Sequence, residues 1–346
     1  MLKYIARRLL QAVPTVIGIT ILTFIIITAA PGGPTAALSL NPRAKQEDRD
    51  RAAAMLGVND PWPVQYIRWV IGDDWELRDR NLDGELEYGT RKGILRGDFG
   101  YSYVQSRPVL QLFAERLGAT LELGFAALLF GLSLGVPIGI MSAVLRGTLF
   151  DNVMRVLAVI VNAVPVFWLG LMLILLFGVQ IKGPDGKGVL PMGSRCPTTL
   201  GGCPDLPQRL NHLILPMIVL GAGGMAGYSR YLRASMLDVI GQDYMRTARA
   251  KGLKDRVVWF AHGARNALIP LATFLGPAIA GVWGGAFITE TIFSWPGIGR
   301  LTLQSLSSLD YPMIMAVTIF SALATILGFI ISDILYALID PRIRFN

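Results

Sequence analysis

The chain contains few of the residues on which most enzymes depend. It has two cysteines, two histidines and 16% charged residues among 346, whereas soluble domains carry about 25% charged residues. His212 and His262 are too few to support a metal triad or a Ser-His-Asp arrangement. The phosphate-binding pattern G-x-x-x-x-G-K-[ST] is absent, because GPDGKG lacks both its spacing and its Ser or Thr. The sequence therefore offers no catalytic centre and no ATP site of its own.

Hydrophobic residues, in contrast, make up 53% of the chain, and the mean hydropathy is +0.50. Six uncharged runs are each long enough to cross a hydrocarbon core about 30 Å thick. The runs are continuously apolar rather than alternating, which predicts helices and not barrel strands. The fold class is therefore predicted to be an all-α polytopic membrane protein with six transmembrane helices. These are Leu9–Ala30, Leu123–Leu145, Val156–Ile181, Leu210–Ser229, Asn266–Thr289 and Tyr311–Ser332.

The short basic segments predict the orientation of these spans. The segment Arg230–Arg265 has eight basic residues and three acidic ones, and the N-terminus and the C-terminal tail are also basic. Six spans place all three segments on one side, so we expect both termini in the cytoplasm. The first run is long and lacks a good cleavage site, which favours a retained anchor over a signal peptide. The net charge of +8 is thus a signal of topology and does not indicate nucleic-acid binding.

The predicted organisation has three parts. Residues 1–30 form a cytoplasmic segment and the first transmembrane helix. Residues 31–118 form an extracytoplasmic region, which is too long for a plain loop and is expected to be partly folded. Residues 119–346 form a five-helix core with a cytoplasmic loop at about 235–268. The lipid bilayer is therefore the first partner that the sequence implies.

One extracytoplasmic stretch, DRNLDGELEYGT at 79–90, resembles the first half of a calcium-binding loop. The position-twelve glutamate is missing, because Thr90 occupies that place. A solvated acidic turn is the alternative. The candidate ligands are Asp79, Asn81, Asp83, Glu85 and Glu87.

Calcium addition distinguishes these two interpretations. A rise in melting temperature on adding calcium, absent from an Asp83→Ala variant, would indicate a weak calcium site, since only a bound ligand stabilises the folded state. An unchanged melting temperature in the wild-type protein would favour the solvated acidic turn.

Both cysteines, Cys196 and Cys203, lie in the outward loop that follows the third span. An oxidising compartment would allow them to form a disulfide, and two unpaired thiols are the alternative in a reducing habitat. Their spacing and the lack of nearby ligands disfavour a metal site.

A strongly basic loop, Gln242–Pro270, lies between the fourth and fifth spans on the predicted cytoplasmic side. We expect one helix over Ser235–Lys251, a break at Gly252, and a second helix over Lys254–Leu268. The first helix has no wide apolar stripe, which excludes a buried core helix. It also lacks the bulky apolar side chains of a membrane-surface helix. A thin helix with a charged rim suits insertion into a cleft of another protein.

Several motifs resemble one family along nearly the whole chain. The stretch DYMRTARAKGL…ARNALIP at 243–270 is similar to the EAA loop of permease subunits in binding-protein-dependent ABC importers. The similarity is greatest to the first permease subunit of dipeptide, oligopeptide and nickel systems, the dipeptide permease B-like branch. Other matching stretches are GDFGYSYVQSRPV at 97–109, RLGATLELGF at 116–125, ITETIFSWPGIGRL at 288–301 and DILYALIDPRIR at 333–344.

This resemblance implies a type I ABC importer permease in a bacterial or archaeal cytoplasmic membrane. In the EAA signature, Arg246 stands where many families have Glu, which is the form of the peptide-type branch. The implied partners are a second homologous permease, two ATP-binding subunits that hold ATP and Mg, and an extracytoplasmic solute-binding protein. No cofactor is implied in this chain itself, apart from the calcium considered above. The implied ATPase contacts are Asp243, Tyr244, Arg246, Thr247, Ala248, Ala250, Lys251 and Gly252.

The six predicted spans contain essentially no ionisable residues, which argues against a proton-coupled transporter. Asn162, Trp168 and Tyr228 are candidates for lining a pathway, although roles in helix packing are equally consistent with their positions. Leu301 belongs to an amphipathic segment at the outer face, which is either a gate or a static brace.

The predicted function is ATP-driven peptide import. Import of nickel, glutathione or an oligosaccharide by the same architecture is the first alternative, and an ATP-independent channel or membrane scaffold is the second. The chain itself is not predicted to be an enzyme.

Overall fold

The computed structural model describes residues 2–29, 53–54, 57, 60–80, 84–196, 206–284 and 286–339. The chain divides into two compact units. The first unit contains Met1–Ile5, Gly118–Arg300 and Ala324–Asn346, and the second contains Ala6–Leu117 and Leu301–Leu323. This spatial division differs from the three consecutive parts expected from the sequence, because the second unit combines segments from both ends of the chain.

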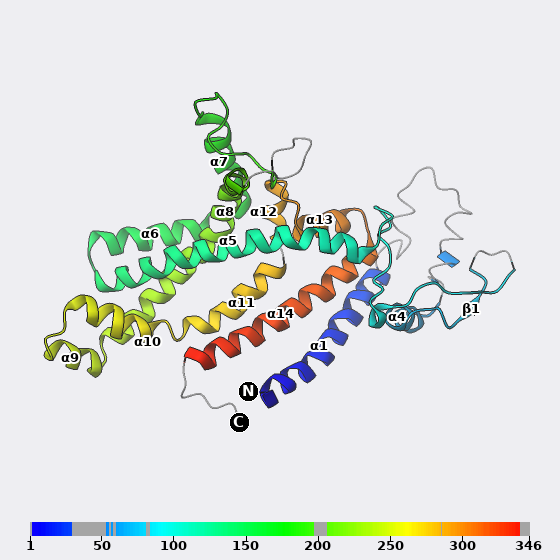
Figure 1. The fold of residues 1–346 in the computed structure, drawn as a ribbon, viewed down its shortest axis with the longest axis horizontal. Coiled ribbons are helices and arrows are strands. Elements are labelled where there is room, and N and C mark those ends of the chain that lie inside the picture. The colour runs from blue at the N-terminus through cyan, green and yellow to red at the C-terminus, as the bar shows by residue number, and fades with distance from the viewer. Residues whose placement is uncertain are drawn as a thin grey trace. The chain divides into compact units, whose positions relative to one another are not determined.

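Four of the predicted spans are confirmed as long apolar helices in the described part of the chain (Figure 1). They correspond to the first, second, fourth and sixth hydrophobic runs. Their helices are α1 (Leu2–Ala29), α5 (Val109–Val144), α8 (Leu206–Ile240) and α14 (Tyr311–Ile339).

The third predicted span, Val156–Ile181, is not one straight helix. Helix α6 (Leu149–Ala163) is followed by α7 (Val166–Leu173), which continues as a π-helical segment, Ile174–Gln180. The two parts are bent by 102° at the break. Pro165 explains the break, because proline disfavours the helical conformation of the preceding residue and cannot donate a backbone hydrogen bond. Val164 accordingly has the extended ψ of 125°.

The fifth predicted span, Asn266–Thr289, is also divided. It contains the end of α10 (Arg265–Ala267), then α11 (Leu271–Gly284) and the beginning of α12 (Phe287–Ile292). Pro270 falls between α10 and α11, where its missing N–H interrupts the helical ladder. The predicted count of six is therefore not confirmed: the described residues contain four spans, or five if the bent pair forms one.

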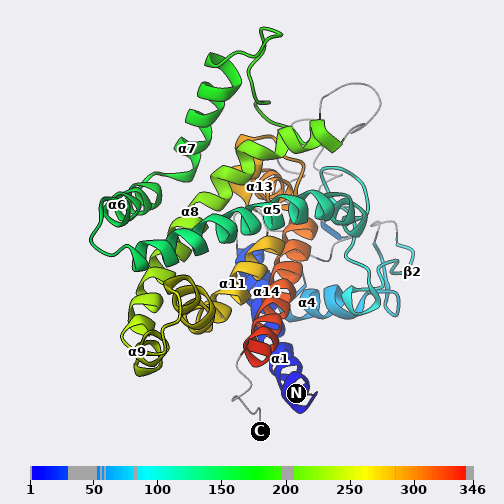
Figure 2. The ribbon, with the colours of Figure 1, turned by 60° about the vertical axis from the view of Figure 1, so that its left-hand side comes forward.

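In the first unit, α5 and α8 approach each other closely through glycines. A Cβ atom on Gly135 would lie 2.6 Å from the carbonyl oxygen of Met225, and one on Gly139 would lie 2.5 Å from that of Ser229. Any larger residue would force the two backbones apart, as in other small-residue interfaces between membrane helices. Figure 2 shows α5 and α8 of this unit from a second direction.

The second unit contains a small folded region that packs on the ends of its long helices. It contains α4 (Trp62–Ile71), a hairpin of β1 (Leu77–Arg78) and β2 (Glu87–Tyr88), and a 3₁₀ turn, Ile94–Arg96. Tyr66 and Trp69 of α4 pack against Phe24 of α1. The hydroxyl groups of Thr20 and Tyr66 lie 2.8 Å apart, within hydrogen-bond distance. The predicted extracytoplasmic region is thus partly folded, and it is anchored by aromatic packing on α1.

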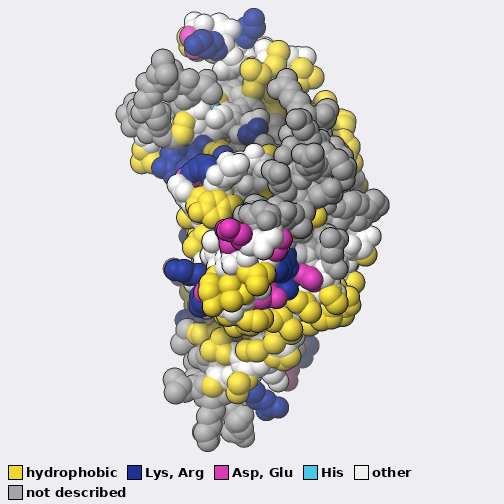
Figure 3. Space-filling model, turned by 90° about the vertical axis from the view of Figure 1, so that its right-hand side faces the viewer, with side chains coloured by type: hydrophobic (Ala, Val, Ile, Leu, Met, Phe, Trp, Pro, Cys, Tyr) yellow, Lys and Arg dark blue, Asp and Glu magenta, His cyan; other side chains and the backbone are white. Residues whose placement is uncertain are grey.

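Ion pairs organise the polar side of the same region. Arg68, which is 5% exposed, donates to both carboxylate oxygens of Glu76 at 2.6 and 2.8 Å and also pairs with Asp60. Asp73 is fully buried and pairs with Arg80 at 3.0 Å and with Arg91 at 2.7 Å. Figure 3 shows acidic and basic side chains beside one another on one face, bordered by hydrophobic ones. Buried charges of this kind are tolerated only when they are paired.

A second buried carboxylate joins distant parts of this unit. Asp310, which is 2% exposed and precedes α14, accepts hydrogen bonds from the Ser102 hydroxyl and, at 3.0 Å, from the backbone N–H of Tyr103. The motif at 97–109 is thereby fixed to the beginning of the last long helix.

Acid should weaken the second unit, because its ion pairs depend on ionised carboxylates. The hydrogen bond from Arg68 holds the pKa of Asp60 below its ordinary value. Burial alone would raise the pKa of Asp73, but Arg91 and Arg80 lower it overall. A lowered folded-state pKa contributes stability above the unfolded pKa of about 3.9, and this stability is lost as pH falls through the folded value.

We therefore expect the free energy of unfolding of the purified protein to fall on acidification below about pH 4. Denaturant titration at pH values from about 6 to about 3 measures this dependence. We expect Asp73→Asn to have a lower free energy of unfolding already at neutral pH, and to lose less of it on acidification than the wild type does. An equal acid dependence in both proteins would contradict the role of Asp73.

Candidate functional site

The basic loop singled out by its sequence contains a short helix, α9 (Asp243–Ala250). Gln242 precedes it in the extended conformation, and Asp243 places a negative charge in its first turn, where the helix dipole favours one. The helix ends before Gly252, whose φ of +76° belongs to the left-handed region that favours glycine. Within the first unit, α9 follows α8 after a short turn (Figure 2).

One edge of α9 is anchored in a small apolar cluster. Met245 is fully buried and Ala248 is 7% exposed, and both pack against the fully buried Val258 of the next helical segment, Val257–Ala264. Gly263 of this segment makes room for the contact, because a Cβ there would lie 2.6 Å from Cε of Met236 and 3.2 Å from Cε of Met245. The two helical segments therefore form a packed pair, which we call the α9 hairpin.

The opposite edge of α9 is exposed and positively charged. The side chains of Asp243 and Arg246 are 97% and 77% exposed, and their charged atoms are 3.7 Å apart. Nearer to the anchored edge, the guanidinium of Arg249 lies 4.4 Å from the centre of the ring of Trp259, which packs against the anchor cluster, and this cation–π contact orients the charge. An ion pair this exposed adds little stability. The charged edge is therefore available to a partner.

Seven of the eight residues predicted to contact the ATPase lie on the surface of the α9 hairpin: Asp243, Tyr244, Arg246, Thr247, Ala250, Lys251 and Gly252. The eighth, Ala248, faces inward, so its small side chain permits packing on Val258 instead of presenting a thin outer surface. The predicted single helix over Ser235–Lys251 is wrong. Helix α8 continues to Ile240, and Gly241 and Gln242 separate it from α9.

Met245, which anchors this helix, is not among the residues predicted from the sequence. Its spacing of three from Ala248 is the signal that would have found it, because residues three apart share a helix face. The stripe is only two residues wide, which is why the pattern did not predict a buried face.

The α9 hairpin is joined to the transmembrane helices through a larger core. Leu232 and Met236 of α8 pack with Ile140 and Ala143 of α5 and with Ala267 of α10. The hydroxyl of Ser235 also donates to the carbonyl oxygen of Ala267 at 2.9 Å. A displacement of α9 would therefore be transmitted to α8 by closely packed side chains.

A buried ion pair connects α6 to α8 within the first unit. Asp151 is 1% exposed and accepts from Nε and Nη2 of Arg233 at 2.6 and 2.7 Å. It also accepts from the backbone N–H of Gly147 at 3.0 Å. This bidentate geometry fixes the connection between α5 and α6 against α8.

A buried carboxylate holds the first turn of α13 (Ile298–Ser307). Glu290 is 1% exposed and accepts from the hydroxyl of Thr120 at 3.0 Å and from the backbone N–H of Arg300 at 2.9 Å. The hydroxyl of Thr120 accepts in turn from the N–H of Ile298 at 2.7 Å. We call this set of contacts the Glu290 clamp, and it joins α5 to α13 of the predicted outer face.

The candidates for a pathway occupy different surroundings. Trp168 is 48% exposed on α7, and Asn162 is an exposed residue whose amide donates to the carbonyl oxygen of Ala158 in its own helix. Tyr228 packs against the core of the first unit. Leu301 is 2% exposed in α13. None of these observations tests a role in the pathway or the gate, so these roles stay predictions.

The remaining candidate sites fall partly outside the described residues. Asn81, Asp83 and Cys203 lie there, so the calcium loop and the Cys196–Cys203 disulfide stay predictions. In the described part of the loop, Asp79 accepts from the N–H of Gly84 at 3.0 Å, and Glu85 and Glu87 are exposed. Within the described residues, no three His, Cys, Asp or Glu side chains are grouped as metal ligands would be.

Comparison with known proteins identifies the family. The model of the binding-protein-dependent transport system inner membrane component matches residues 135–345, and the N-terminal model of the same system's membrane component matches residues 1–124. The chain belongs to this family of ABC importer permeases. Its members work with ATPase and solute-binding partners, so ATP hydrolysis takes place on separate subunits.

Two similar proteins match along their whole length. The oligopeptide transport system permease protein AppB of Bacillus subtilis is 40% identical over 100% of both chains. The dipeptide transport system permease protein DppB of Escherichia coli K12 is 36% identical over 99% of both chains.

The fold is similar to that of a solved chain of the inward-facing MetNI methionine ABC transporter. The TM-score is 0.53 at 17% identity, over 68% of this chain and 100% of that one.

Removing the Thr120 hydroxyl should destabilise the Glu290 clamp. Thr120→Val leaves an oxygen of Glu290 and the N–H of Ile298 without this partner, and each buried unsatisfied group costs about 1–3 kcal/mol. We expect a lower free energy of unfolding for the purified protein, measured by thermal or denaturant unfolding.

Thr28→Val is the matched control, because among the described residues that hydroxyl donates only to carbonyl oxygens of its own helix, Phe24 and Ile25. Equal stability of the two variants would contradict the Glu290 clamp.

Proposed function

We propose that the chain is the permease subunit of an ATP-driven peptide importer and pairs with a second homologous permease. A solute-binding protein delivers the peptide to the extracytoplasmic face, and two ATP-binding subunits bind ATP on the other side. Both termini lie in the cytoplasm in this arrangement, and the membrane is the cytoplasmic membrane of a bacterium or archaeon. Full-length similarity to permeases named for oligopeptides and dipeptides supports the choice of substrate.

The observation that carries the proposal is the two-sided character of α9. Its inner edge, Met245 and Ala248, is buried against Val258, while Arg246 projects from its outer edge. A cleft in an ATPase subunit would receive the outer edge, and the buried edge would pass its displacement to α8. ATP would then favour one arrangement of the helices through differential contacts at α9.

Glutathione is a second candidate substrate. The glutathione transport system permease protein GsiC of Salmonella paratyphi A is 35% identical over 100% of both chains. Glutathione is itself a tripeptide, so the same path would suit its size and its polar backbone. Selectivity is expected mainly in the solute-binding partner, and uptake of a peptide panel by the reconstituted system decides between the substrates.

Reversal of the two exposed arginine charges of α9 tests the coupling. In Arg246→Glu with Arg249→Glu, ATP hydrolysis by the assembled transporter should no longer drive uptake, because attraction to the ATPase cleft becomes repulsion. We expect a fall in ATP-dependent peptide uptake into proteoliposomes of at least about tenfold, which corresponds to about 1.4 kcal/mol of lost coupling.

Arg146→Glu with Arg155→Glu is the matched control, because it changes the net charge equally on another connection with exposed side chains. Circular dichroism and thermal unfolding verify that both proteins remain folded. Unchanged uptake by the α9 variant would show that this surface does not couple ATP to transport.

A further inference from the structure

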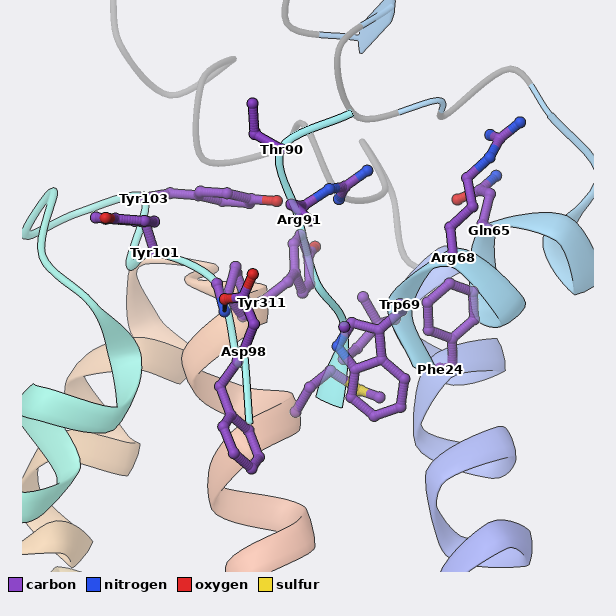
Figure 4. Close-up of a pocket in the computed structure, with 16 residues that line it drawn as sticks. Phe24, Gln65, Arg68, Trp69, Thr90, Arg91, Asp98, Tyr101, Tyr103 and Tyr311 are labelled. Atoms are coloured by element: carbon purple, nitrogen blue, oxygen red, sulfur yellow. Dashed lines mark hydrogen bonds between the residues drawn. The ribbon is translucent and has the colours of Figure 1, made fainter. Parts of the chain in front are cut away.

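The second unit contains a cavity of about 450 Å³ that the proposed transport function does not use. Its walls come from α1, α4, the segment at 90–103 and the beginning of α14, and Figure 4 shows the side chains that line it. Aromatic residues contribute most of the bulky side chains: Phe24, Trp69, Phe99, Tyr101, Tyr103 and Tyr311. A mostly apolar cavity of this size with a few polar groups is typical of a small-molecule site.

One polar group in the wall has no partner among the residues that the structure describes. Tyr311 is 6% exposed, and its hydroxyl makes no hydrogen bond to any residue that the structure describes. Buried hydroxyl groups are nearly always hydrogen-bonded, so an unpaired one indicates a missing partner. A ligand oxygen in the cavity would supply it.

The charges around the cavity favour an anionic group in this ligand. Arg91 lines the cavity and shares the buried carboxylate of Asp73 with Arg80, so two guanidinium groups face one carboxylate. Arg68 is already neutralised, because it pairs with Asp60 and Glu76. Asp98 is the acidic side chain in the wall, and its carboxylate accepts backbone hydrogen bonds from Lys92 and Gly100 at 2.8 and 2.9 Å. Arg91 thus offers a guanidinium whose counter-ion, Asp73, is shared with Arg80.

The apolar part of the cavity belongs to membrane helices. Phe24 and Ile27 lie in the span Ala6–Ala29, and Met315 lies in the span Tyr311–Ile334. The same turns of α1 expose Ile25 and Ile26, which would contact lipid chains in a bilayer. The apolar walls of the cavity therefore lie at the end of a membrane helix. Its charged group, Arg91, lies beyond that end.

We propose that this cavity binds one membrane phospholipid, with the phosphate group near Arg91 and Tyr311 and part of an acyl chain along Phe24, Ile27 and Met315. An amphipathic ligand with a single phosphate meets both requirements, since the guanidinium and the phenol are donors and the helix ends are apolar. A peptide would also bring a carboxylate, but it would place no long apolar chain beside the spans.

Lipid retention by the purified full-length chain tests the proposal. The protein is exchanged into lipid-free detergent and titrated with phosphatidylglycerol and phosphatidylethanolamine, and native mass spectrometry counts the bound lipid. We expect one tightly held phospholipid in the wild type. Tyr311→Phe should weaken its binding about tenfold, because it removes a hydrogen bond to a charged group.

Three further variants make the result specific. Tyr88→Phe is the matched control, since this tyrosine is 60% exposed in β2, outside the cavity, and its change should leave lipid binding unaltered. Thr90→Trp places a bulky ring at an exposed position in the cavity wall and should reduce binding without loss of a buried contact. Lipids with brominated chains should quench Trp69 fluorescence, measured as the difference from Trp69→Phe.

The assignment is overturned if the wild type retains no lipid, or if Tyr311→Phe binds as much lipid as Tyr88→Phe. Displacement of the lipid by inorganic phosphate alone would show that the site binds the anion and not the acyl chain, which also overturns it. Displacement by a short peptide such as trialanine would assign the cavity to substrate instead. Since each readout is binding by this chain alone, none of these results depends on peptide uptake by the assembled transporter.

Discussion

Met245 and Ala248 pack against Val258, and the orientation of the whole α9 hairpin depends on this contact. A helix of eight residues is not stable by itself in water, because nucleation costs more than so few hydrogen bonds return. Burial of one edge therefore fixes α9 and determines which side chains face outward. The same cluster meets Met236 of α8 beside Gly263, so the exposed Arg246 is connected to a transmembrane helix through packed side chains.

Buried polar contacts supply the remaining rigidity of the first unit. The Asp151–Arg233 pair fixes the start of α6 to α8, and the Glu290 clamp fixes the first turn of α13 to α5. A carboxylate in a nonpolar surrounding must have partners, so neither contact can open without a large cost in desolvation. Rigid connections of this kind are what alternating access by movement of whole helices requires.

Prolines stand at two of the breaks that divide the apolar runs into separate helices. Pro165 separates α6 from α7, and Pro270 separates α10 from α11, although hydropathy was continuous across both positions. Hydropathy measures only the transfer of side chains to hydrocarbon. A bend depends instead on the missing backbone donor and on the hydrogen-bond partners that neighbouring helices supply. The runs with prolines at 14, 137 and 216 nevertheless remained long helices, so the effect of a proline depended on its surroundings.

The sequence by itself determined the membrane class, four of the spans, the family and the position of the basic loop, because these depend on composition and on local motifs. Only the tertiary structure decided that Ala248 faces inward, that Glu290 is satisfied by Thr120, and that Asp310 holds the segment at 97–109. Each of these contacts joins a side chain to a face of another element. The periodicity of one segment does not predict which other element packs against it. That is decided by tertiary packing.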